Sequence, residues 1–154
     1  MPYFPLPDSP HGAGRLYYEE QGAAEPLLFV AGLGGLGAFW SAQLGVFAQT
    51  HRVVTFDHRG TGQSTHSPIR YSIAQMADDT LALLDHLKID RAHFAGHSTG
   101  GAIGQHLAAR APARIGDLVL SCTWPRADAY FRRLFEVREA VLSRRGRVVH
   151  HRPA

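Results

Sequence analysis

A five-residue segment of the chain combines residue types that could carry out nucleophilic chemistry. Residues 96–100 read Gly-His-Ser-Thr-Gly, a G-x-S-x-G pattern with Ser98 at its centre. An apolar run at residues 92–95 precedes the pattern, and a helical pattern begins at residue 102. A serine at the tip of a tight strand-to-helix turn has a strained backbone, so its neighbours must be small. Gly96 and Gly100 provide that room, and we predict that Ser98 is a nucleophile lifted above the strand ends.

The same turn directs the first N–H groups of the following helix toward the serine hydroxyl. Such groups stabilise the negative charge that develops on a carbonyl oxygen under attack. Glycine and serine also fill ordinary loops, and the bare G-x-S-x-G pattern occurs by chance. The strand before it, the helix after it and a third glycine, Gly101, favour the catalytic interpretation.

Three features, which follow one another in the family's order, make the chain resemble the α/β-hydrolases. One is the Ser98 turn. Another is residues 32–35, Gly-Leu-Gly-Gly, which follow the apolar residues 27–31 and match the family's oxyanion-hole turn. The third is residues 57–64, Asp-His-Arg-Gly-Thr-Gly-Gln-Ser, which match the family's D-x-R-G-x-G-x-S loop.

The resemblance covers about residues 15–143. Within the family, residues 71–76 and 131–139 look most like the aminoacrylate hydrolases of pyrimidine breakdown. The 3-oxoadipate enol-lactonases are the next most similar group. The resemblance therefore implies a hydrolase of small ester, amide, carbamate or enol-lactone carbonyls that needs no cofactor.

The resemblance also implies roles for individual residues. Ser98 would be the nucleophile, and the backbone N–H groups of Leu33 and Thr99 would form the oxyanion hole. Many relatives have histidine before the first glycine of the oxyanion turn, whereas this chain has Ala31. Because the donor in that turn is a main-chain N–H, this difference need not abolish the hole.

Short apolar runs alternate with helical patterns, which indicates an α/β fold with a mainly parallel sheet. We predict the α/β-hydrolase fold with about six of its eight strands, flanking helices and the start of a cap. Residues 1–125 would form the N-terminal part of the core, residues 126–143 the first cap helix, and residues 144–154 a basic irregular tail. The strands are expected at residues 16–20, 27–31, 52–56, 92–96 and 118–122, and the helices at residues 39–49, 72–87, 102–110 and 127–142.

A histidine and a carboxylate must activate a catalytic serine, and the sequence offers no good candidate for either. In the family they usually follow later strands, so we expect the chain to be truncated and its activity impaired. His97, Asp128, His150 and His151 are weaker candidates. The change of composition at residue 144 suggests a frameshift or premature stop. On the last predicted helix and just before it, Trp124, Phe131 and Phe135 fit either a substrate pocket or a packing face.

Two other classes of protein fit parts of the sequence. Residues 32–37 also satisfy G-x-G-x-x-G, and Asp57 follows at the distance expected of a dinucleotide-binding fold. That interpretation leaves the Ser98 turn and residues 57–64 unexplained. The other alternative is a non-catalytic binding protein on a degenerate hydrolase core, and an intact Ser98 turn argues against it.

Composition sets the remaining expectations. The 154 residues are 45% hydrophobic, which is enough for one folded domain. Cys122 is the only cysteine, so we expect no internal disulfide and a cytoplasmic location. The net charge is −2 for residues 1–125 and +5 for residues 126–154, which does not support a basic groove for nucleic acid. We expect no metal and no membrane partner, a small-molecule carbonyl substrate, and self-association through an exposed sheet edge.

Overall fold

The computed structural model describes residues 2–6, 13–67 and 69–149. The chain divides into two compact units, Met1–Thr123 and Trp124–Ala154. Within the described residues, no helix has both the length and the apolar character needed to cross a membrane.

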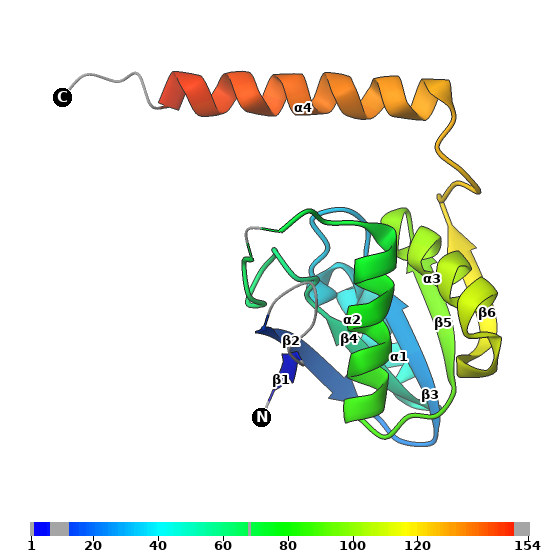
Figure 1. The fold of residues 1–154 in the computed structure, drawn as a ribbon. Coiled ribbons are helices and arrows are strands. Elements are labelled where there is room, and N and C mark those ends of the chain that lie inside the picture. Colours follow the sequence, from blue (N-terminus) through cyan, green and yellow to red (C-terminus); the bar gives the residue numbers. More distant parts are fainter. Residues whose placement is uncertain (1, 7–12, 68, 150–154) are drawn as a thin grey trace. The chain divides into compact units, whose positions relative to one another are not determined.

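The first unit is built on a six-stranded sheet with the strand order β1-β2-β4-β3-β5-β6 (Figure 1). The four strands β4, β3, β5 and β6 run parallel, whereas β1 and β2 are antiparallel to their neighbours. The predicted α/β fold with a mainly parallel sheet is therefore confirmed. The strands are β1 (Tyr3–Leu6), β2 (Gly14–Gln21), β3 (Glu25–Val30), β4 (His51–Phe56), β5 (Ala92–His97) and β6 (Ile115–Ser121).

Helices cover both faces of this sheet because alternate residues of the central strands point to opposite sides. Leu28 and Val30 of β3 belong to the larger core, which α2 and α3 cover. Leu27 and Phe29 belong to a smaller core under α1, on the other face (Figure 1). The helical segments are η1 (Gly37–Trp40), α1 (Ser41–Phe47), α2 (Ile73–His86), α3 (Thr99–Arg110) and η2 (Pro112–Arg114). Ser72 caps α2 as predicted, because its hydroxyl accepts from the Gln75 N–H at 3.1 Å.

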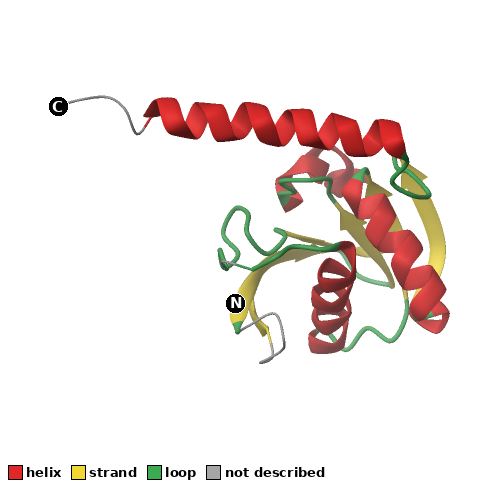
Figure 2. Ribbon diagram, turned by 45° about the horizontal axis from the view of Figure 1, so that its top comes forward, coloured by secondary structure: helices red, strands yellow, loops and turns green. Residues whose placement is uncertain are grey.

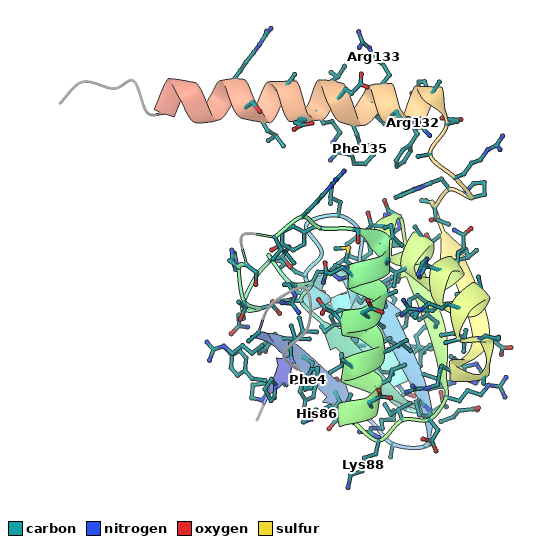
Figure 3. All side chains as sticks on the ribbon, viewed as in Figure 1. Phe4, His86, Lys88, Arg132, Arg133 and Phe135 are labelled. Carbon is teal, nitrogen blue, oxygen red and sulfur yellow. The ribbon has the colours of Figure 1, made fainter. Side chains whose placement is uncertain are left out.

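The sequence analysis missed β1 and placed the start of α3 three residues too late. β1 is only four residues long, contains Pro5 and, among the described residues, pairs only with β2. Proline is tolerated there because β1 is an edge strand. The ring of Phe4 stacks on His86 at the end of α2, with 4.7 Å between ring centroids, and this contact anchors β1 (Figure 3).

The second unit contains one long helix, α4 (Ala129–Val149) (Figure 2). We predicted irregular structure from residue 144, and this is wrong for residues 144–149, which continue the helix. Arginine and other straight-chain residues favour helix even without an apolar period. Residues 150–154 lie outside the described part of the chain. Arg133 and Phe135 project from opposite sides of α4 (Figure 3).

Candidate active site

Ser98 lies in a sharp turn between β5 and α3. Its backbone has φ 54° and ψ −116°, a left-handed conformation that is unfavourable for residues other than glycine. Three hydrogen bonds hold it there. The Ser98 N–H donates to the carbonyl of Ser121 at 2.8 Å, and the Ser98 carbonyl accepts from Thr123 Oγ1 at 2.8 Å and from the Ala102 N–H at 3.2 Å. Ser98 is half-buried, so part of the residue stays open to solvent.

The turn is possible only because glycines surround it. A Cβ atom on Gly96 would lie 2.5 Å from the carbonyl carbon of Gly100. A Cβ atom on Gly100 would lie 2.1 Å from the carbonyl oxygen of Val30. Both contacts are with backbone atoms, which cannot move aside as a flexible side chain can. A larger residue at either position would therefore clash with the backbone around the turn.

The glycine-rich turn at residues 32–35 lies against Ser98. A Cβ atom on Gly32 would be 3.1 Å from the Ser98 Cβ, because β3 and β5 are parallel neighbours with Val30 opposite Gly96. Leu33 is 59% exposed, and no acceptor in the described part of the chain takes up its backbone N–H. Thr99 is the first residue of α3, where N–H groups have no partner within the helix. The structure therefore brings all the sequence-predicted site residues together at the carboxyl ends of the adjacent strands β3 and β5.

The histidine next to the serine is occupied elsewhere. His97 Nδ1 lies 3.2 Å from Ser121 Oγ, and the ring stacks on Phe39 with centroids 5.0 Å apart. Asp128, in the second unit, accepts from the Phe131 N–H at 2.8 Å and so caps α4. His150 and His151 lie outside the described residues. Among the described residues, no histidine or carboxylate side chain forms a hydrogen bond with the Ser98 hydroxyl.

Residues 57–64 brace the site from the end of β4. Asp57 Oδ1 accepts from the Gly37 N–H at 2.8 Å, and its Oδ2 accepts from the Gln63 N–H at 2.9 Å. Ser64 Oγ donates to the Asp57 carbonyl at 2.6 Å and accepts from the Tyr17 N–H at 2.9 Å. These bonds tie the loop to β2 and to η1. Sequence analysis recognised the pattern but could not assign these partners, which lie 20 or more residues away in two cases.

A buried ion pair fixes the same loop to α2. Arg59 Nε and Nη2 donate to Asp79 Oδ2 and Oδ1 at 2.9 and 2.8 Å, and the two side chains are 1% and 8% exposed. Gln75 also donates to Asp79. Sequence analysis missed this pair. The available signal was Gln75 and Asp79, two polar residues spaced i, i+4 beside the apolar stripe of a helix.

Among the described residues, no group of three or more histidine, cysteine, aspartate or glutamate side chains is placed to hold a metal ion.

Comparison with known proteins identifies the family. The family model described as alpha/beta hydrolase fold matches residues 25–145. This chain belongs to the α/β-hydrolase family. A protein of Azorhizobium caulinodans named "Putative carbamate hydrolase RutD" is 43% identical over 137 residues, which make up 89% of this chain and 52% of that protein. A similarly named protein of Caulobacter vibrioides is 42% identical over 145 residues.

Solved structures agree with this assignment. A hydrolase from Pseudomonas aeruginosa matches with a TM-score of 0.80 and 37% identity, over 91% of this chain and 52% of that one. An enol-lactonase from Burkholderia xenovorans matches with a TM-score of 0.72 and 33% identity, over 84% and 55% of the two chains. The chain thus spans about half the length of the curated relatives it matches.

Proposed function

We propose that this chain carries the nucleophile and the oxyanion hole of a serine hydrolase for small carbamate, lactone, ester or amide carbonyls. The observation that carries the proposal is the left-handed Ser98 turn lying against the Gly32 turn. The names of the relatives, a carbamate hydrolase and an enol-lactonase, support this range of substrates.

In the proposed mechanism, a histidine removes the proton of the Ser98 hydroxyl as Oγ attacks the carbonyl carbon. The N–H groups of Leu33 and Thr99 stabilise the resulting oxyanion, and each such donor contributes about 2.7–4 kcal/mol in other enzymes. The leaving group departs with the proton from the histidine, and water then hydrolyses the acyl-enzyme. No step requires a cofactor.

The histidine and the carboxylate that orients it are proposed to come from outside the described residues. The absence of a described partner for the Ser98 hydroxyl and the half-length match to the relatives both favour this arrangement. A chain that has only the nucleophile would react slowly, since a serine hydroxyl is a weak nucleophile without its base.

A chimera tests the proposal directly. Residues 1–143 would be joined to the part of the Azorhizobium caulinodans protein that lies beyond the matched region. We expect the chimera to hydrolyse p-nitrophenyl acetate and to react with a fluorophosphonate probe far faster than the chain alone. Ser98→Ala should abolish both activities, whereas Ser41→Ala, at an exposed serine on α1, should leave them unchanged. A folded chimera that is inactive, or whose labelling survives Ser98→Ala, would favour a binding protein instead.

The dinucleotide-binding alternative loses support from the surroundings of the glycine turn. The turn follows β3, the first of the parallel strands, as it does in dinucleotide-binding folds, so the topology alone does not decide. However, the Ser98 side chain occupies the space beside Gly32, with 3.1 Å between Ser98 Cβ and a Cβ placed on Gly32. The intact glycines around Ser98 likewise argue against a degenerate core.

Self-association through β6 is a further part of the proposal. Within the described residues β6 pairs only with β5, and its Val119 and Leu120 are 59% and 44% exposed. Such an edge is a template for pairing with another chain. We expect sedimentation velocity to show oligomers that grow with protein concentration. Val119→Lys should shift the distribution toward monomer, and a single concentration-independent monomer peak for the unmodified chain would contradict the idea.

A further inference from the structure

His58 is a buried titratable residue that the proposed mechanism does not use. Its side chain is fully enclosed, and the residue is 2% exposed. The imidazole Nε2 lies 3.0 Å from the carbonyl oxygen of Ala31. Because a carbonyl oxygen can only accept, Nε2 must carry the hydrogen. The hydrogen bond therefore requires one particular tautomer.

This bond reaches one end of the oxyanion turn, and the backbone of the same loop reaches the other. Ala31 immediately precedes Gly32, where the turn begins. At the far end, the carbonyl of Gly35 accepts from the His58 N–H at 3.1 Å and from Thr61 Oγ1 at 2.9 Å. His58 thus contacts the turn on both sides of Leu33.

The packing leaves the turn little freedom. A Cβ atom on Gly35 would lie 2.5 Å from His58 Cδ2 and 2.5 Å from the carbonyl oxygen of Gly32. The Gly32 carbonyl and the Leu33 N–H belong to one planar peptide unit, so fixing the carbonyl fixes the N–H. The imidazole ring and the Gly32 carbonyl oxygen therefore both lie close against Gly35.

We propose that His58 is a positioning residue whose Nε2–H bond to the Ala31 carbonyl sets the orientation of the Leu33 N–H in the oxyanion hole. The role of this bond in catalysis rests on the proposed function. Its effect on the Leu33 N–H can be measured on the chain alone.

Protonation chemistry supports the arrangement. Burial lowers the pKa of His58 below its ordinary value, against the opposing effects of the Ala31 carbonyl and of the Asp79 and Asp57 carboxylates. The ring is therefore neutral at pH 7. Since the unfolded chain binds the proton more readily, the contribution of His58 to stability is full above pH of about 6.5 and is lost as pH falls. His58→Gln should therefore show a smaller loss of stability between pH 7.5 and pH 5 than the unmodified chain.

The test compares two variants by nuclear magnetic resonance of the ¹⁵N-labelled chain. His58→Gln keeps a side-chain N–H donor, whereas His58→Leu removes it. We expect the Leu33 and Gly34 amide signals to shift and their hydrogen exchange to accelerate about 10-fold or more in His58→Leu, and to stay near their original values in His58→Gln. His106→Leu, at a half-buried histidine on α3, is the matched control and should leave the Leu33 signal in place.

If a variant does not fold, the imidazole of His58 can be observed directly in the unmodified chain. Its ¹⁵N shifts should report a neutral ring protonated on Nε2, and an Nδ1–H tautomer would overturn the proposal. An unchanged Leu33 amide in folded His58→Leu would also overturn it. In the active chimera, His58→Leu should lower kcat by roughly 10- to 100-fold with little change in KM. If the chimera is inactive while the amide signals respond as expected, the proposed function fails and the positioning role stands.

Discussion

Replacing Asp79 with alanine is expected to lower the free energy of unfolding by about 3–5 kcal/mol. The substitution removes the carboxylate that accepts two hydrogen bonds from the Arg59 guanidinium, whose side chain is 1% exposed. Removing one partner of a buried ion pair is costly because the remaining charge loses this counter-charge while it stays out of water. Since domains of this size are stable by only about 5–15 kcal/mol, the variant should unfold at a much lower urea concentration. Equilibrium urea denaturation followed by circular dichroism measures the loss.

The neighbouring residue provides the matched control. Asp78 also forms an ion pair, with Arg110, but both side chains are more than 40% exposed. Exposed pairs contribute about 0–1 kcal/mol, so Asp78→Ala should have little effect. The double variant Arg59→Met with Asp79→Leu should recover part of the loss, because it removes both charges. If Asp79→Ala proves as mild as Asp78→Ala, the pair does not hold the 57–64 loop as described.

Gly100→Ala is expected to cost at least about 3 kcal/mol of stability and to remove the Ser98 turn. The added methyl group would lie 2.1 Å from the Val30 carbonyl oxygen and 2.7 Å from that of Ala31. Both belong to the chain at the end of β3, so α3 must move away from the central strand. Urea denaturation gives the change in stability, and fluorophosphonate labelling of the chimera gives the effect on Ser98.

A second glycine separates this clash from the general effect of replacing glycine by alanine. Gly45 lies within α1, and a Cβ atom there meets no atom within 4 Å. Gly45→Ala should therefore raise the stability by about 0.5–1 kcal/mol, because alanine favours helix. A Gly100→Ala variant that behaves like Gly45→Ala would show that α3 is not packed tightly on β3.

Local sequence signals predicted most of the fold and the position of the Ser98 turn. The apolar runs located five of the strands, and Ser72 marked the start of α2 because its capping depends on residues only three apart. The G-x-S-x-G pattern located the Ser98 turn for the same reason, since its constraint is local and steric. β1 could not be found because its pairing with β2 outweighs the unfavourable Pro5.

The supporting contacts of the site could not be predicted because they join distant parts of the chain. Arg59 and Asp79 are 20 residues apart, and His58 and Ala31 are 27 apart. Nothing in the local pattern distinguishes such partners from exposed polar residues. Only the arrangement of β3, β4 and α2 brings them together.

The position of the two turns in the sheet also bears on how the proposed chemistry could change over evolution. Both emerge from β3 and β5, adjacent strands in the interior of the sheet, and the glycines between them leave no volume for larger residues. New substrate preferences would therefore have to arise from exposed side chains whose replacement does not disturb the Ser98 and Gly32 turns. Leu33, Leu36 and Phe39 are such side chains. A different type of reaction would require other residues in the Ser98 and Gly32 turns, and these would destabilise the fold.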